Sequence, residues 1–331
     1  MTTFGIIGTN WITDRFMQAA GETGEFVASA VYSRTAERAD EFADKYGIPH
    51  RYSDLEQFAA SGAFEAVYIA SPTAFHARQA IACMEQGKHV LVEKPIASNA
   101  AETREMFEVA RRNGVLLMEA MMTTQLPNFE AIRDHLGEVG TIRRYFASYC
   151  QYSSRYDAFK RGELPNAFNP QLSNGSLMDL GIYCLYPLIA LFGKPDSLLA
   201  NAHMLPSGAD GEGSMLLSYE QMDAVVMYSK ITNSYAPAEI QGENATIVFQ
   251  PAQCPEEVEI RYRDGTVRNI GRPQTNSPMY YETRAFIDLL KRGEREDPTN
   301  SPFNSITTIA VIEEARRQIG LVFPADKGGQ A

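Results

Sequence analysis

The segment Phe4-Gly-Ile-Ile-Gly8-Thr-Asn10-Trp-Ile-Thr13 decides the fold. It predicts a β-strand, a tight turn and the start of a helix, an arrangement that points backbone N–H groups at a pair of phosphates. The dinucleotide-binding pattern G-x-G-x-x-G keeps only its first glycine here, because Asn10 and Thr13 stand at the other glycine positions. Asparagine tolerates left-handed backbone conformations better than other non-glycine residues, so the turn can survive. The predicted cofactor contacts are Gly8, Thr9, Asn10, Trp11 and Ile12.

The next expected strand, Phe26–Tyr32, ends about 20 residues further on, where an NAD-dependent enzyme carries an acidic residue for the ribose hydroxyls. Ser33 and Arg34 follow this strand instead. A hydroxyl and a guanidinium suit a 2′-phosphate, so we predict NADP(H) as the preferred cofactor, NAD(H) as the alternative, and Arg38 as an assisting contact. The other interpretation of Arg34 is a solvated side chain that opens the helix expected over 35–46.

Strands and helices keep alternating as far as residue 122. Further strands are expected at 66–70, 90–93 and 115–118, with helices at 55–61, 77–86 and 100–113. Strands that alternate with helices in this way indicate a doubly wound parallel sheet. We therefore predict an α/β Rossmann domain over residues 1–122.

After residue 122 the pattern changes to period-2 alternation in segments rich in Tyr, Val and Ile. These segments are 141–152, 214–219, 224–231 and 239–250, and 258–270 is a hairpin turning at Asp264-Gly265. Helices are expected at 128–135, 279–292 and 305–319, and the last is a candidate for packing back on the first domain. Residues 123–331 thus predict an α+β domain with a large, mostly antiparallel open sheet.

Composition limits the classes of function. With 331 residues the chain exceeds the about 250–300 residues of a single core, and its charge of −11 argues against a nucleic-acid partner. The four cysteines and five histidines show no metal or redox spacing. No apolar run approaches the about 20 residues that span a membrane, and the early strand leaves no room for a signal peptide, so we expect a cytoplasmic protein.

The stretch Val90-Leu-Val-Glu-Lys-Pro95 ends an apolar strand on an acid, a base and a proline. Ligands of parallel α/β sheets bind at the carboxyl ends of the strands. Lys94 is therefore a candidate catalytic group, and the alternative interpretation is a surface lysine that ends a strand.

Several motifs together resemble the Gfo/Idh/MocA oxidoreductase family over nearly the whole chain. They are the nucleotide turn, Ala70-Ser-Pro-Thr-Ala-Phe-His76, Gly87-Lys-His-Val-Leu-Val-Glu-Lys-Pro95, Asn174-Gly-Ser-Leu-Met-Asp-Leu-Gly-Ile-Tyr183 and Phe323-Pro-Ala-Asp326. The pattern is nearest to the branch of glucose-fructose oxidoreductase and dimeric dihydrodiol dehydrogenase. The resemblance implies hydride transfer between NAD(P) and a hydroxyl or carbonyl of a sugar, polyol or cyclic diol, and a homodimer formed through the C-terminal sheet.

Carried over by position, the resemblance makes Lys94, Asp179 and Tyr183 the catalytic residues. Many members have histidine where this chain has Tyr183, so the proton donor here is phenolic. The residues that it places at the cofactor are Ser71, Pro72, Thr73, His76, Glu93 and Lys94, and the substrate candidates are Met122, Tyr156 and Asn169. His76 has the alternative interpretation of a satisfied histidine at a helix start.

The residues themselves also suggest this chemistry. Asp179 and Tyr183 are four apart in the segment 176–192, whose periodicity predicts a helix, so they share one face. An ammonium beside a phenol favours the phenolate and lowers the phenol pKa, and it stabilises a developing alkoxide. We therefore predict Tyr183 as acid/base, Lys94 as its activator and Asp179 as an orienting group. Lys94 and Tyr183 exchange proton-transfer roles in the alternative.

Two other functions compete with an oxidoreductase. One is a non-catalytic NAD(P)-sensing regulator on the same fold, which has no need of Lys94, Asp179 and Tyr183. The other is an NAD-dependent glycosidase, which fits poorly with Ser33 and Arg34.

Overall fold

The computed structural model describes residues 1–327. It contains two compact units, one of residues 1–121 and 276–305, the other of residues 122–275 and 306 onward. This differs from the expected division at residue 122, because the segment 276–305 belongs to the first unit and the C-terminal helix, from residue 306, to the second.

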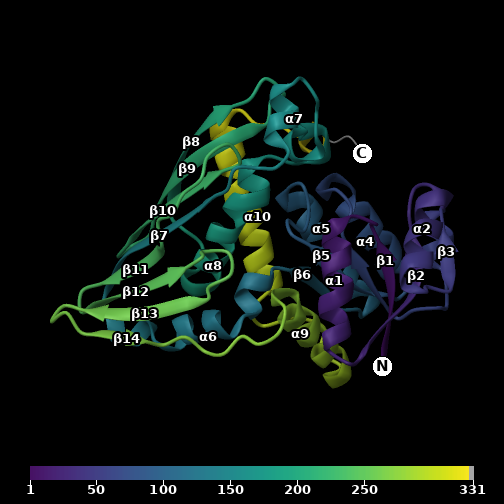
Figure 1. Ribbon diagram of the computed structural model, residues 1–331, viewed down its shortest axis with the longest axis horizontal. Coiled ribbons are helices and arrows are strands. Elements are labelled where there is room, and N and C mark those ends of the chain that lie inside the picture. The colour runs from purple at the N-terminus through teal and green to yellow at the C-terminus, as the bar shows by residue number, and fades with distance from the viewer. Residues whose placement is uncertain (328–331) are drawn as a thin grey trace. The chain divides into compact units, whose positions relative to one another are not determined.

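The first unit is built on a six-stranded parallel sheet (Figure 1). The strands run in the order β3-β2-β1-β4-β5-β6, so the order reverses beside β1, which pairs with both β2 and β4. They are β1 Thr2–Ile7, β2 Phe26–Tyr32, β3 His50–Tyr52, β4 Ala66–Ile69, β5 His89–Glu93 and β6 Leu117–Ala120. The helices are α1 Trp11–Glu22, α2 Ala36–Tyr46, α3 Leu55–Ala59, η1 Thr73–Phe75, α4 His76–Glu85, α5 Ala100–Asn113 and α9 Pro278–Arg292. The predicted Rossmann sheet is confirmed, and such a switch point is where open α/β sheets bind ligands.

Aromatic packing and one asparagine explain why α9 joins the first unit. The ring of Phe286 on α9 lies 5.9 Å from that of Phe4 on β1. Further on, Asn300 Nδ2 donates to the carbonyl oxygens of Glu119 and Met121, at 3.0 and 3.1 Å, and so ties the returning chain to the end of β6. Neither contact has a local sequence signal.

The second unit contains an eight-stranded sheet in the order β14-β13-β12-β11-β7-β10-β9-β8. All neighbouring pairs are antiparallel except β7 with β10, so the prediction of a mostly antiparallel sheet is confirmed. The strands are β7 Ile142–Cys150, β8 Ser197–Met204, β9 Asp210–Ser218, β10 Asp223–Ser229, β11 Ala238–Gly242, β12 Ala245–Gln250, β13 Glu257–Tyr262 and β14 Val267–Asn269. The helices are η2 Met122–Gln125, α6 Pro127–Asp134, η3 Leu136–Val139, α7 Tyr156–Lys160, η4 Asn166–Phe168, η5 Pro170–Leu172, η6 Leu177–Gly181, α8 Ile182–Phe192, α10 Pro302–Ile319 and η7 Pro324–Lys327.

The single strand expected over 239–250 is wrong. The chain turns at Glu243 and Asn244, so that β11 and β12 form a hairpin. The turn is held from outside, because the N–H groups of Glu243 and Asn244 donate to the carbonyl oxygens of Thr141 and Val139 at 3.0 and 2.9 Å. These tertiary bonds replace the Asn-Gly or Asp-Gly signature that marks a hairpin in a sequence.

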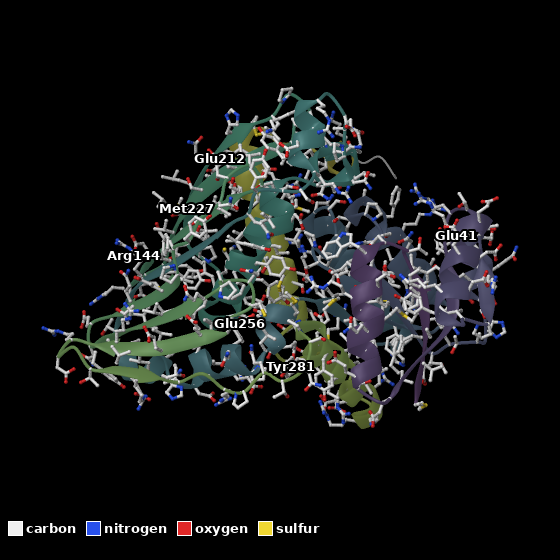
Figure 2. The ribbon with its side chains drawn as sticks, viewed as in Figure 1. Glu41, Arg144, Glu212, Met227, Glu256 and Tyr281 are labelled. Atoms are coloured by element: carbon white, nitrogen blue, oxygen red, sulfur yellow. The ribbon has the colours of Figure 1, made fainter. Side chains whose placement is uncertain are left out.

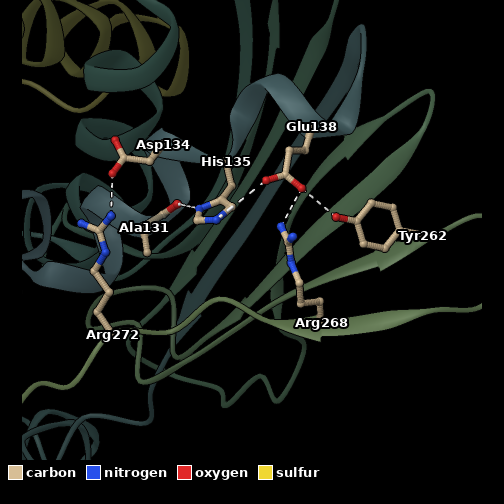
Figure 3. Close-up of polar contacts among 7 residues, drawn as sticks. All are labelled: Ala131, Asp134, His135, Glu138, Tyr262, Arg268 and Arg272. Atoms are coloured by element: carbon tan, nitrogen blue, oxygen red, sulfur yellow. Dashed lines mark hydrogen bonds and ion pairs between the residues drawn. The ribbon is translucent and has the colours of Figure 1, made fainter.

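A polar cluster joins α6 and η3 to the β13–β14 hairpin (Figure 3). Glu138 Oε2 accepts from Tyr262 at 2.7 Å and from Arg268 at 2.6 Å. Arg272 donates to Asp134 at 2.6 Å, and His135 bonds the Ala131 carbonyl at 2.7 Å. Exposed pairs of this kind contribute about 0–1 kcal/mol each, so the cluster adds little to stability.

Contrary to expectation, one described segment, Pro170–Phe192, is long and apolar enough to cross a membrane. Most of its apolar window is buried inside the protein. That burial is typical of a core helix of a soluble protein, where the apolar surface packs on other elements.

Candidate active site

The nucleotide turn between β1 and α1 depends on one glycine. Gly8 has φ +99°, and a Cβ there would lie 2.7 Å from the Ala70 carbonyl oxygen. A side chain at this position is therefore excluded by both conformation and space. The close approach of β1 to the end of β4 leaves the first turn of α1 at the switch point of the sheet, and this cradle fits the pyrophosphate of a dinucleotide.

Asn10 stabilises the turn through its side chain, which the sequence did not indicate. Its φ of −105° is extended, so its tolerance for left-handed conformations is not used. Instead its Oδ1 accepts from the N–H groups of Ile12 (2.9 Å) and Thr13 (3.4 Å), and its Nδ2 donates to Ala70 (2.7 Å). Asn10 is thus the N-cap of α1. The cap engages the Ile12 N–H that was predicted to meet the cofactor.

Ser33 and Arg34 follow β2, as predicted. The guanidinium of Arg34 is exposed and lies 5.6 Å from the centre of the Phe75 ring. Arg38 is exposed in the first turn of α2, where Thr35 caps its backbone N–H. The loops after β2 and β4 therefore meet at Arg34 and Phe75, on the carboxyl side of the sheet.

The loop after β4 brings Ser71, Pro72 and Thr73 to the same edge. Ser71 donates to Gln79 at 2.6 Å, and Thr73 is buried in η1. His76 is 1% exposed, with one ring nitrogen 2.7 Å from the Ser71 carbonyl and the other 2.9 Å from the Pro95 carbonyl. Burial lowers the pKa of His76, although the carbonyl contacts oppose that shift. This geometry favours the interpretation of His76 as a satisfied histidine, here one that ties the loop to the segment after Lys94.

Lys94 follows β5 directly and is half-buried. Two buried carboxyl groups, Glu93 and Glu119, lie on the paired strands β5 and β6 that end beside it. Glu93 accepts from Tyr68 at 2.7 Å, and Glu119 on β6 accepts from the Ile96 N–H at 2.9 Å. Burial raises the pKa of Glu119 to about 7, with Lys94 opposing the shift electrostatically. The available signal was Glu119, an acid that directly follows the apolar run 115–118.

In the second unit, Asp179 lies within η6, a π-helical turn, and Tyr183 lies in the first turn of α8. π-Helical turns are rare and occur frequently at functional sites. Tyr183 is half-buried. Its ring and the ring of Tyr149 on β7 pack edge to face, with their centroids 5.6 Å apart. The predicted helix over 176–192 therefore exists, but its beginning is wound more widely than an α-helix.

Two residues at the neighbouring strands β9 and β10 contact this helix and were not predicted from the sequence. Lys230, just after β10, donates to Asp179 Oδ2 at 2.9 Å. Asp210, at the start of β9, accepts from the Leu177 N–H at 2.6 Å and so caps the helix that carries Asp179. The alternation Ala224, Val226, Tyr228, Lys230 was the available signal, because it assigns the lysine to the buried face.

The substrate candidates of the second unit have local roles. Tyr156 begins α7 and packs 5.6 Å from the Phe168 ring. Asn169 caps η5 by accepting from the Gln171 N–H at 3.0 Å. Met122 begins η2 and is half-buried. No group of metal-ligand type gathers within residues 1–327.

Comparison with family models decides the classification. Residues 2–121 match the oxidoreductase family with an NAD-binding Rossmann fold, and residues 131–248 match the Gfo/Idh/MocA C-terminal domain. The chain belongs to the Gfo/Idh/MocA oxidoreductase family. The predicted resemblance and the prediction of an NAD(P)-dependent oxidoreductase are thereby confirmed.

Named relatives of this family member extend over its whole length. A scyllo-inositol 2-dehydrogenase (NADP(+)) of Bacillus subtilis is 56% identical, over 99% of this chain and 100% of that protein. A trans-1,2-dihydrobenzene-1,2-diol dehydrogenase of Mus musculus is 32% identical, over 98% of each. Among solved structures, a 3-ketoreductase of Actinomadura kijaniata in complex with NADP has a TM-score of 0.84 at 22% identity, covering 97% of this chain and 99% of that one. This last likeness supports the fold alone.

Proposed function

We propose that this protein is an NADP-dependent dehydrogenase that transfers hydride between the nicotinamide and the ring carbon that bears a hydroxyl or ketone oxygen in a cyclic polyol, with scyllo-inositol as the first candidate. One observation carries the proposal, the 56% identity with the scyllo-inositol 2-dehydrogenase over essentially the full length of both proteins. The relative named trans-1,2-dihydrobenzene-1,2-diol dehydrogenase is less similar, at 32% identity.

The preference for NADP(H) over NAD(H) is supported at the end of β2. Arg34 is exposed there beside Ser33, and neither residue repels a 2′-phosphate as a carboxylate does. A guanidinium binds phosphate through paired hydrogen bonds and also stacks on flat rings. The relative from Bacillus subtilis is itself NADP-dependent by name.

The proposed chemistry uses Lys94, Asp179 and Tyr183 on one substrate. When bound, the nicotinamide supplies or accepts the hydride. In the oxidation direction Tyr183 takes the proton of the substrate hydroxyl, and in reduction it returns that proton to the carbonyl oxygen. The Lys94 ammonium stabilises both the phenolate and the developing alkoxide, and Asp179 orients the polyol by accepting from a hydroxyl. Met122, Tyr156 and Asn169 stay proposals as substrate contacts.

The test is a substrate panel followed at 340 nm. We expect NADP⁺ reduction with scyllo-inositol, slower turnover with other inositols and aldoses, and loss of about 100-fold or more in kcat for Lys94→Met, the size typical of losing a general acid–base partner. If the protein oxidises a dihydrodiol and no inositol, the proposed substrate is wrong. Full activity of Lys94→Met would overturn the proposed centre.

We further propose that the protein acts as a homodimer whose subunits meet through the outer face of the second sheet, the face turned away from α8. Arg144 and Met227 lie on that face (Figure 2). An apolar row crosses four adjacent strands in register, made of Leu199, Leu216, Val225 and Phe146. Leu199 is 70% and Leu216 55% exposed, and soluble proteins usually cover such rows.

The extent of this face supports a second copy as its occupant. Eight strands about 4.8 Å apart and about 20 Å long present roughly 700 Å², comparable to the roughly 800 Å² per partner of a stable interface. A cytoplasmic location is likewise a proposal, supported by the four cysteines, all of which are free thiols.

A further inference from the structure

Lys230 is the buried lysine of the second unit that the proposed chemistry does not use. Its side chain is 3% exposed. A buried ammonium is strongly unfavourable unless its donors are all paired. Here Nζ lies 2.9 Å from Asp179 Oδ2, 2.9 Å from the Ala167 carbonyl oxygen and 3.0 Å from Asn174 Oδ1. These three acceptors match the three donors of an ammonium.

The strand holds Lys230 rigidly in this position. Its backbone N–H donates to Gly211 at 2.9 Å, and its carbonyl accepts from Ser153 at 2.8 Å. Its side chain also lies 5.7 Å from the centre of the buried Phe168 ring. Lys230 is thus fixed at both its backbone and its ammonium, whereas the Asp179 side chain is 38% exposed.

Neighbouring residues on the same face of β10 support the π-helical turn. Tyr228 alternates with Lys230 and packs under Gly181, where an added Cβ would lie 3.1 Å from the tyrosine ring. Asp210, from the adjacent strand, caps the beginning of the turn at Leu177. Burial raises the pKa of Asp210, and the positive charge of Lys230 opposes that shift. The turn that carries Asp179 is therefore held at its start, its middle and its end.

The same ammonium connects Asp179 to the segment that precedes it. Ala167 lies in η4, next to Phe168, whose ring packs against Tyr156 and Phe159 of α7. Asn174 also accepts from the Gly175 N–H at 2.8 Å and so shapes the entry to the helix. Lys230 therefore fixes Asp179 relative to the loop that contains the proposed substrate contacts Tyr156 and Asn169.

We propose that Lys230 is a positioning residue for the reaction, which acts through Asp179 by holding its carboxylate in one orientation toward the polyol. The inference rests on the proposed function, because it assigns Lys230 a role only if Asp179 contacts substrate. A misplacement of about 1 Å in such a group costs about 100-fold in rate, so loss of Lys230 should appear mainly in kcat.

The experiment is a double-mutant cycle with Lys230→Met, Asp179→Asn and the combined variant. We expect Lys230→Met to lower kcat by about 10- to 100-fold, with KM changed by only a few-fold and the NADPH dissociation constant unchanged. Since Lys230 acts through Asp179, the combined variant should be no slower than Asp179→Asn alone. Multiplied losses in the combined variant, or an unchanged kcat for Lys230→Met, would overturn the proposal.

Two further variants separate positioning from folding. Lys230→Gln keeps amide donors for Ala167 and Asn174 but removes the charge, so it should fold and still show the loss in kcat. Arg316→Met removes another buried cation, one that pairs with Asp326 at 2.6 Å, and should lower the melting temperature without changing kcat. A Lys230→Gln variant with wild-type kcat contradicts the role of the charge.

The failure of this inference is distinguishable from failure of the proposed function. If the wild type oxidises no polyol with NADP⁺, the proposed function is wrong and this inference falls with it. If the wild type is active and Asp179→Asn retains full kcat, the proposed function stands, and the role of Asp179 and this inference are wrong. If Asp179→Asn is slow while Lys230→Met is not, only the role of Lys230 is wrong.

Discussion

Glu119 is a buried acid within β6, one residue before the end of the strand. Its Oε1 accepts from the Ile96 N–H, two residues after Lys94. Burial raises its pKa from 4.5 to about 7, and Glu93 adds to the shift. The pKa of Glu282, on α9, is raised by burial and by Glu93 as well. Burial therefore favours the protonated forms of Glu119 and Glu282 in the folded chain.

This proton uptake predicts a pH dependence of stability. Between about pH 4.5 and pH 7 Glu119 is protonated in the native state and ionised in the unfolded state, so its contribution is present at low pH and is lost as pH rises through about 7. The wild type should lose about 3 kcal/mol of its free energy of unfolding over this range, and Glu119→Gln should not show this loss. Urea unfolding at pH 5 and pH 7.5 measures it, and an equal pH dependence in the variant and the wild type would contradict the shift.

A second prediction at this scale concerns cofactor choice. Arg34→Asp places a carboxylate where the 2′-phosphate is proposed to bind, so NADPH affinity should fall by about 100-fold while NADH affinity holds or rises. Titration of nicotinamide fluorescence with both nucleotides measures this change. Equal affinities of the wild type for NADPH and NADH would sink the 2′-phosphate argument.

The matched control for that experiment is Arg104→Asp. Arg104 is exposed on α5 in the same unit, so the variant makes the same change in net charge away from the nucleotide turn. It should leave both affinities unchanged. A similar loss of NADPH affinity in this control would show that the effect is one of overall charge.

At the scale of elements, the junction of η6 and α8 depends on Gly181. A Cβ at this position would lie 2.9 Å from the Leu177 side chain and 3.1 Å from the Tyr228 ring. Gly181→Ala should therefore destabilise the protein by about 1–3 kcal/mol and reduce kcat, because the crowding falls between Asp179 and Tyr183. Thermal unfolding and steady-state kinetics test both effects.

Gly21→Ala is the control for helix propensity. Gly21 also lies in a helix, α1, but nothing stands within 4 Å of the position of an added Cβ. Alanine there should stabilise the protein by up to about 1 kcal/mol. Stabilisation by both substitutions would show that Gly181 is not a packing constraint.

The sequence predicted elements well where one local pattern sufficed. The parallel strands of the first sheet are apolar runs between helices, and the Asp264-Gly265 hairpin forms as expected, with Gly265 at φ +89°. The prediction from the sequence failed at β11 and β12, because the turn between them is stabilised by the carbonyl groups of Val139 and Thr141 rather than by turn residues of its own. The π-helical turn was also missed, since its wider winding depends on Asp210 and Tyr228 from neighbouring strands.

At the scale of the whole molecule, the outer face of the second sheet carries the prediction about assembly. Leu216→Lys together with Leu199→Lys places charges in the centre of the apolar row, and burying them at an interface is strongly unfavourable. We expect the wild type to sediment as a dimer and the double variant as a monomer. A wild type that stays monomeric at micromolar concentration would remove the proposal.

Val322→Lys serves as the matched control for assembly. Val322 is an exposed apolar residue of the same unit, but it follows α10 and is not part of the sheet. Its replacement should leave the dimer intact. Dissociation of this control as well would point to a general effect of added charge.

The sequence by itself determined the alternating strands and helices, the glycine turn at Gly8, the basic end of β2 and the place of Lys94 after an apolar strand. These features depend on neighbours within a few residues, because period, turn chemistry and capping are local. Only the tertiary structure decided which distant groups meet. Asp210 caps Leu177 from 33 residues away, Lys230 binds Asn174 across 56 residues, and Asn300 binds the Glu119 carbonyl across 181. Such contacts follow from which strands lie side by side and which side chains the core encloses, and no local pattern specifies either.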